Sequence, residues 1–220
     1  MIPFPFDLYV TTNNLDKKNF IDNYLITNSK AHKYEVIITP NKGRDVIPFL
    51  IQIKDVLNKY KYKYLCHIHT KKHFVGRKND INWQHYLYEN LLGDEIIIKK
   101  ILSDFEINDK LGFIFPEHFY KKIRFVYHFN KMNYFYLDKI LELLFPKMRI
   151  KSGNIINFPS GNMFWARTEA IYQIFNDRII NLAPEEKGQI DGTILHAIER
   201  VWLFLVKLNG FNYKTILYFI

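Results

Sequence analysis

Strand and helix patterns alternate through the first third of the chain. Phe6–Thr11 and Tyr34–Thr39 predict strands, and Leu15–Ile26 between them carries apolar residues at helical spacing. Val46–Tyr60 predicts a second helix, and Tyr62–His69 predicts a third strand. This order and spacing are typical of βαβ units, whose strands lie parallel. The sequence therefore predicts an α/β fold with a mostly parallel sheet flanked by helices.

The remaining chain continues the alternation, and no repeat, low-complexity linker or domain boundary interrupts it. We assign no element to the aromatic, basic stretch from Glu117 to Asn133. The other predicted helices are Trp83–Leu92, Asp94–Phe105, Tyr134–Phe145 and Asp191–Leu208, and the other predicted strands are Leu111–Phe115, the run after Ser160, and Tyr213–Ile220.

Composition narrows the class of protein. The 220 residues are 48% hydrophobic and 17% aromatic, which is enough for a packed core and too apolar for a disordered chain. The net charge of +9 favours an anionic partner, although the residue usage of an AT-rich genome accounts for part of it. Cys66 is the only cysteine, so the sequence excludes an intrachain disulfide and favours a reducing compartment. Met1–Asp7 lacks the basic start of a signal peptide, and no apolar run reaches the ~20 residues of a membrane span.

The stretch Tyr62–Lys72 ends a buried strand in a group of polar and basic side chains. His67 and His69 alternate along the strand, so both imidazoles are expected on the same side. In an open α/β sheet, ligands bind beyond the carboxyl ends of the strands. Imidazoles there can ligate a metal, exchange protons or donate to a diphosphate, but Lys71 and Lys72 would repel a cation. The stretch therefore favours an anion, although a single histidine at a strand end is ordinarily a satisfied core residue.

A polar loop, Asn41–Asp45, follows the second strand and precedes a helix. Gly43 permits a positive φ and a close approach of the backbone to a ligand. Arg44 offers a planar fork for phosphate or carboxylate. Asp45 is placed to cap the helix or to accept hydrogen bonds from a base or ribose. The loop is either part of a ligand site or a tight turn with a capped helix and a solvated arginine.

A second loop, Ser160–Asn162, leads into an apolar run. An aromatic ring at the rim of a cleft packs against the C–H face of a sugar, which makes Trp165 a candidate. Alternation puts Phe164 and Trp165 on opposite faces, so at least one of them belongs to the core. Thr168 is expected to cap a helix over Glu169–Phe175.

Acidic side chains gather before the last long helix. Glu185, Glu186 and Asp191 lie in the loop or at the expected helix start. A carboxylate there can act as a general base, or it can cap the helix, whose dipole favours negative charge at this end. On the helix itself, His196 and Arg200 lie four residues apart and share a face.

Five segments of the chain, in this order, resemble the rhamnan synthesis F family of bacterial proteins, which act in cell-surface polysaccharide assembly. The segments are Pro40–Leu50 (PNKGRDVIPFL), Tyr64–Lys72 (YLCHIHTKK), Leu111–Pro116 (LGFIFP), Ser160–Arg167 (SGNMFWAR) and Gly188–Arg200 (GQIDGTILHAIER). The resemblance extends from about Phe6 to Arg200, and its specificity comes from the ordered set. It implies a glycosyltransferase with a GT-A-like, Rossmann-like nucleotide-binding fold.

The resemblance also implies how the chain is divided. It implies a single domain over residues 1–220, with a nucleotide-binding part of about 1–116 and an acceptor and catalytic part of about 117–220. A GT-A sheet normally begins with a strand and a helix before the position of Phe6–Thr11, so we expect this sheet to lack that first strand. Thr11 stands where the fold usually carries an acid for the base.

By the same resemblance, the candidate residues divide into four groups. His67, His69, Lys71 and Arg44 are implied to bind the donor diphosphate, and Thr11, Asn41, Gly43 and Asp45 the nucleotide. Gly161, Asn162, Trp165 and His196 are implied on the acceptor side, and Asp191, with Glu186 as a rival, as the catalytic base. His67 and His69 occupy the place of an Asp-x-Asp metal motif, so we expect neither a metal nor a cofactor, and positive side chains would stabilise the leaving diphosphate directly.

The resulting hypothesis is transfer of a sugar from a nucleotide sugar to a growing cell-surface polysaccharide by an inverting displacement. The family name points to rhamnose as the sugar. The expected partners are the nucleotide sugar and a lipid-linked or polymeric glycan acceptor, but not nucleic acid. We expect a cytoplasmic protein that contacts the inner face of the membrane through its basic, aromatic stretch Phe119–Phe135.

Three alternatives remain open at the level of sequence. The missing first strand motivates a non-catalytic module that binds glycan or a partner enzyme. His67 and His69 motivate a metal-dependent hydrolase. The basic segments His73–Lys78 and Lys121–Arg124 motivate nucleic-acid binding, which predicts an affinity that falls steeply with salt.

Overall fold

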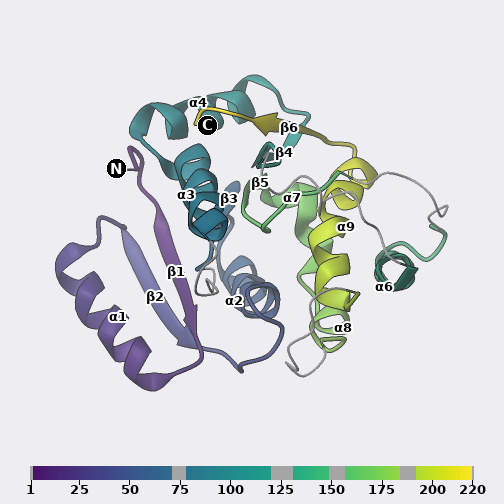
Figure 1. Ribbon diagram of the computed structural model, residues 1–220, viewed down its shortest axis with the longest axis horizontal. Coiled ribbons are helices and arrows are strands. Elements are labelled where there is room, and N and C mark those ends of the chain that lie inside the picture. Colours follow the sequence, from purple (N-terminus) through teal and green to yellow (C-terminus); the bar gives the residue numbers. More distant parts are fainter. Residues whose placement is uncertain (1, 71–77, 120–130, 149–156, 184–191, 220) are drawn as a thin grey trace.

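The computed structural model describes residues 2–70, 78–119, 131–148, 157–183 and 192–219. In this part of the chain the strands form two sheets, one of two strands and one of four, with helices packed around them (Figure 1). The predicted α/β class is confirmed.

The first sheet is a parallel βαβ unit. Strand β1 (Asp7–Thr12) pairs in parallel with β2 (Lys33–Ile38), and α1 (Leu15–Asn28) connects them. Asn14 begins α1, because its side chain accepts a hydrogen bond from the Lys17 N–H at 2.9 Å. This unit matches the alternation predicted from the sequence.

The second sheet has the order β3-β5-β4-β6 and is mixed. Strand β5 (Phe164–Arg167) runs antiparallel to both β3 (Tyr64–His67) and β4 (Leu111–Pro116), whereas β6 (Asn212–Ile216) is parallel to β4. The prediction of a mostly parallel sheet is therefore wrong here. The reason is that β5, which comes from the second half of the chain, enters between two earlier strands in the opposite direction.

Most helices lie where the sequence predicts them, but α3 (Lys78–Leu92) begins before the predicted start at Trp83, and α8 (Asp177–Ile180) is not among the predicted helices. A break at Gly93 separates α3 from α4, and Asp94 caps α4 by accepting from the Ile97 N–H at 2.8 Å. The helices after α1 are α2 (Val46–Lys59), α3 (Lys78–Leu92), α4 (Glu95–Ile107), α6 (Lys131–Leu144), α7 (Thr168–Ile171), the 3₁₀ turn η2 (Tyr172–Ile174), α8 (Asp177–Ile180) and α9 (Ile194–Leu208). None of the described helices combines the length and apolar character needed to cross a bilayer.

The core has two layers, one on each face of the mixed sheet. Phe113 and Phe164 belong to a cluster that includes residues of α2, α6 and α9. Ile114 and Trp165 belong to the other cluster, with residues of α3 and α4. Phe164 and Trp165 thus lie on opposite faces, as alternation predicts, and both are buried.

The predicted starts of α7 and α9 also differ from the structure. Thr168 is the first residue of α7, and Arg167 precedes the helix. The Thr168 hydroxyl is buried without a hydrogen-bond partner among the described residues, so the predicted cap is wrong. Helix α9 begins at Ile194, after Thr193, whose N–H donates to the His196 Nδ1 at 3.4 Å.

Candidate functional site

Three loops that are far apart in the sequence meet at one polar cluster, which consists of Asp45, His69 and Asn162. The Asn162 side-chain amide donates to Asp45 Oδ2 at 2.8 Å. The His69 Nε2 lies 3.4 Å from the same oxygen. The loop Asn41–Asp45, the loop Ser160–Asn162 and the end of the histidine strand thus come together, although Asp45 and Asn162 are 117 residues apart in the sequence.

Asp45 does not cap the helix that follows it. Its backbone is helical, with φ −77° and ψ −26°, and its carboxylate makes no hydrogen bond to the first turn of α2. A capping side chain requires an extended backbone at this position, so the predicted cap is wrong. The carboxylate is directed instead to Asn162 and His69, and its side chain is 16% exposed.

The backbone of two of the loops is left-handed where they approach the cluster. Gly43 and Arg44 have φ values of +74° and +55°, and Gly161 and Asn162 have +92° and +56°. The Asn162 N–H donates to Pro159 O at 2.8 Å and closes a turn with Gly161 at its third position. Left-handed backbone at a residue other than glycine costs about 1–2 kcal/mol and is concentrated at ligand sites. Both loops are therefore held in a shape that local preference alone would not select.

Gly43 also brings two helices close to the loop. A Cβ added at this position would lie 2.1 Å from the Ile47 Cγ1 of α2 and 3.4 Å from the Leu195 Cδ2 of α9. The start of α9 therefore contacts the loop that carries Arg44 and Asp45.

The two histidines differ in what surrounds them. His67 is buried: its Nδ1 donates to Asn162 O at 2.7 Å, and its ring stacks on Phe49 with centroids 3.9 Å apart. His69 is 14% exposed, and its Nε2 donates to Gly161 O at 2.8 Å. The two rings lie 5.7 Å apart, in accord with the predicted common side.

His69 faces oxygen atoms at both ring nitrogens. Its Nδ1 lies 3.0 Å from Thr70 O, while its Nε2 lies near Gly161 O and the Asp45 carboxylate. Carbonyl and carboxylate oxygens accept hydrogen bonds, so each ring nitrogen of His69 has an acceptor beside it. These contacts hold the ring in one orientation within the cluster.

Asn162 joins the cluster to the core. Besides its bond to Asp45, its Oδ1 accepts from the Trp202 indole N–H at 2.8 Å, and its side chain is almost fully buried. Sequence reasoning missed Trp202 and Phe49, because nothing near them in the sequence marks them. Both lie on the apolar faces of helices, where an aromatic residue predicts packing alone.

The remaining described candidates lie at different places. The Thr39 N–H donates to Thr12 O at 2.8 Å, so the end of β1, with Thr11, lies beside the loop after β2. Asn41 and Arg44 are exposed in that loop. Trp165 points to the opposite face of the mixed sheet from His67, and its indole N–H donates to Leu91 O at 3.0 Å.

His196 and Arg200 belong to the start of α9. The His196 Nδ1 lies 2.8 Å from Thr193 Oγ1, and Arg200 Nη1 donates to His196 O at 2.7 Å. The Arg200 guanidinium lies 4.4 Å from the centre of the Phe158 ring, just before the Asn162 turn. Both side chains are buried.

Three candidates, Lys71, Glu186 and Asp191, lie outside the described residues. The basic segments 73–77 and 121–124 also lie there. Within the described ranges, no group of three or more His, Cys, Asp and Glu side chains is arranged to hold a metal ion.

The sequence model of one family, described as rhamnan synthesis protein F, matches residues 1–211. The chain belongs to the rhamnan synthesis protein F family. The family's description points to a role in polysaccharide synthesis. The resemblance drawn from the five segments is thereby confirmed.

Two curated relatives are similar to the chain, and both are described as uncharacterized protein WxcX. They come from two strains of Xanthomonas campestris pv. campestris, and each is 29% identical over 181 residues. The match includes 80% of this chain and 24% of each relative, so the chain spans about a quarter of the length of the relatives it matches. No solved structure matches.

Proposed function

We propose that this chain is a GT-A-like transferase domain that moves a sugar from a nucleotide donor to a growing cell-surface polysaccharide. The single observation that carries the proposal is the position of the Asp45 carboxylate. It does not cap α2, and it contacts Asn162 and His69 instead. The family's role in polysaccharide synthesis supplies the substrate class.

The chemistry of the cluster supports binding of an anionic donor. Arg44 is exposed beside Asp45, and the His69 Nε2 lies 3.4 Å from the Asp45 carboxylate. Positive groups fixed around a leaving diphosphate stabilise the charge that develops in the transition state. We propose that Arg44 and His69, together with Lys71, contact the diphosphate and do so without a divalent metal.

In this proposal the buried candidates, His67 and Asn162, position other residues of the site and do not contact the ligand. His67 holds the backbone of Asn162, and the Asn162 side chain holds the Asp45 carboxylate beside His69, whose side chain is 14% exposed. Asp45 then orients the His69 imidazole, and we propose that it also contacts the ribose or base of the donor. Asp191, with Glu186 as its rival, remains the proposed base for the acceptor hydroxyl.

Thermal melting with a panel of nucleoside diphosphates and nucleotide sugars, in EDTA and in Mn²⁺, tests the proposal. A ligand at about 100 times its Kd stabilises the native state by roughly 2.7 kcal/mol. For a chain of this size that raises Tm by roughly 5–10 °C. We expect one nucleotide to give such a shift in EDTA.

The matched variants are His69→Ala and His85→Ala. His85 is an exposed histidine on α3 that lies 3.6 Å from Glu89 one turn away, so its removal controls for the loss of an imidazole. The ligand-dependent shift should disappear in His69→Ala and persist in His85→Ala. A shift only in Mn²⁺ would contradict the metal-free mechanism. No shift with any nucleotide would contradict the transferase proposal and favour a glycan- or partner-binding module.

A further inference from the structure

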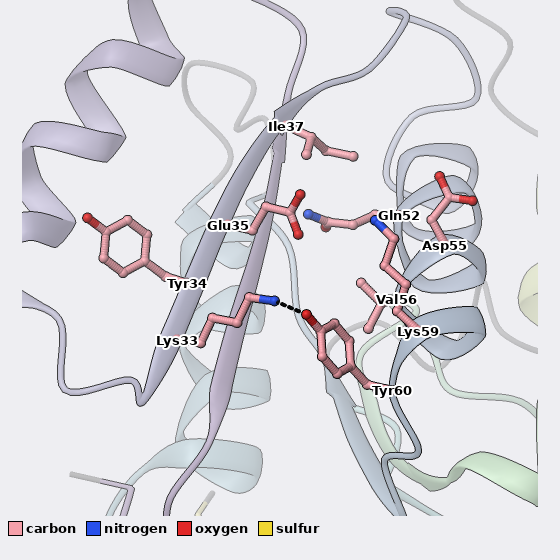
Figure 2. A pocket seen from close by; sticks show the side chains of 9 residues that line it. All are labelled: Lys33, Tyr34, Glu35, Ile37, Gln52, Asp55, Val56, Lys59 and Tyr60. Atoms are coloured by element: carbon pink, nitrogen blue, oxygen red, sulfur yellow. Dashed lines mark hydrogen bonds between the residues drawn. The ribbon is translucent and has the colours of Figure 1, made fainter.

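A cavity of about 290 Å³ opens between β2 and α2 (Figure 2). Its lining residues come from one strand and one helix: Lys33, Tyr34, Glu35, Ile37, Gln52, Asp55, Val56, Lys59 and Tyr60. Asp45 precedes α2, whereas Lys59 and Tyr60 lie at its other end. A helix rises about 1.5 Å per residue, so the cavity begins at Gln52, roughly 10 Å along α2 from Asp45, and ends at Tyr60, roughly 20 Å from it. Asp45, His69 and Asn162 are not among its lining residues.

The polar side chains of the cavity converge from both walls. Lys33, Glu35 and Ile37 alternate along β2 and share its face toward α2, while Tyr34 points away (Figure 2). Gln52 projects from α2 toward Glu35. Its amide is fixed, because Nε2 donates to Val10 O at 3.2 Å and the residue is only 5% exposed.

The aromatic ring of Tyr60 is fixed at one end of the cavity. The Lys33 Nζ donates to its hydroxyl at 2.6 Å and lies 4.2 Å from the ring centre. The Tyr62 ring packs against it with centroids 5.9 Å apart. Tyr60 nevertheless remains 41% exposed, so a part of the residue is available to a ligand.

The charges and the size of the cavity limit what it can bind. The lining includes two lysines, Lys33 and Lys59, and two carboxylates, Glu35 and Asp55, so it has no excess positive charge for a diphosphate. Ligand pockets usually hold about 300–1,000 Å³, which makes this one small for a nucleotide sugar. A neutral ligand of about one ring in size fits both limits.

We propose that this cavity binds a single sugar unit of a glycan. Sugar hydroxyls both donate and accept, and the cavity offers acceptors on Glu35 and Asp55 beside donors on Lys59. The fixed Tyr60 ring provides an apolar surface for the C–H face of the sugar. The identification of this glycan as the acceptor rests on the proposed function, in which the cavity would hold the glycan roughly 10–20 Å from the transfer site.

Saturation-transfer NMR on the 220-residue chain, with L-rhamnose, D-glucose, D-galactose, D-mannose and N-acetyl-D-glucosamine as probes, tests the inference. We expect at least one probe to bind. Glu35→Gln and Tyr60→Ala should each weaken that binding by about tenfold, because each removes one principal contact. The matched controls are Asp109→Asn, an exposed acid before β4, and Tyr172→Ala, a tyrosine that is 49% exposed. These controls should leave the affinity unchanged.

The outcomes separate this inference from the proposed function. Sugar binding that Glu35→Gln and Tyr60→Ala weaken, in a chain that binds no nucleotide, supports the cavity and contradicts the transferase. Nucleotide binding that depends on His69, without binding of any probe sugar, overturns the cavity alone. Sugar binding that neither cavity variant changes also overturns it, because the sugar then binds elsewhere.

Discussion

Replacing Asn162 by alanine should be among the most costly single changes in the chain. The change leaves the buried indole N–H of Trp202 without its acceptor, which costs about 1–3 kcal/mol. It also removes the hydrogen bond to the Asp45 carboxylate, for about 1.5–3 kcal/mol. Alanine at φ +56° adds about 1 kcal/mol, because asparagine tolerates this left-handed region better. We expect Asn162→Ala to lower the free energy of unfolding by roughly 4–6 kcal/mol and Tm by roughly 10–20 °C.

Asn162→Gly is the matched control, because it loses the same side-chain bonds but accepts a positive φ. It should be about 1 kcal/mol more stable than Asn162→Ala in urea unfolding. A second control replaces Trp202 by phenylalanine, which removes the indole donor. In the Asn162→Ala background this replacement should cost about 1–2 kcal/mol less than in the wild type. A loss below about 1 kcal/mol for Asn162→Ala, or equal stability of the alanine and glycine variants, would refute the reasoning.

Two further predictions concern stability. Gly43→Ala should lower the free energy of unfolding by about 3 kcal/mol, as measured in urea, because φ is +74° and the new Cβ would lie 2.1 Å from Ile47. A decrease below about 1 kcal/mol would show that the loop can move away from α2. Tyr62→Phe should cost about 1 kcal/mol at neutral pH, because the Tyr62 hydroxyl donates to the Asp7 carboxylate and holds the pKa of Asp7 below its usual value. A lowered carboxyl pKa contributes stability above the unfolded pKa of about 3.9, and that stability is lost as pH falls through the folded value. The difference between Tyr62→Phe and the wild type should therefore shrink below about pH 4, and a difference that stays constant with pH would contradict this role of Tyr62.

The elements of the first half could be predicted because their signals are local. The apolar spacing of Leu15–Ile26 and the β-rich run Tyr34–Thr39 gave α1 and β2 to within two residues. The same local reasoning left Asp45 either as a helix cap or as a ligand contact, and the structure excludes the cap. Its carboxylate is directed elsewhere because Asn162, 117 residues away, supplies a partner that no local pattern reveals.

The sheet order and the cavity between β2 and α2 could not be predicted, because they depend on which distant segments meet. The antiparallel entry of β5 rests on pairs such as Tyr64 with Arg167, and no periodicity in either strand encodes it. The cavity combines residues of β2 with residues of α2 from Gln52 onward, and no local pattern in either element indicates a ligand site. The predicted roles of Lys71, Glu186 and Asp191 stay predictions.

The position of β5 has a consequence for the order in which the chain acquires its structure. During synthesis, β3 and β4 leave the ribosome well before Phe164–Arg167, yet β5 is the strand that lies between them. Synthesis proceeds at roughly 5–20 residues per second, so several seconds pass between β4 and β5. During this time the edges of β3 and β4 that later pair with β5 have no partner strand. Because β5 directly follows the Ser160–Asn162 turn, its insertion also brings Asn162 to Asp45 and His69. The polar cluster therefore forms in the same late step that closes the sheet, and a nascent chain that stops before this strand has neither.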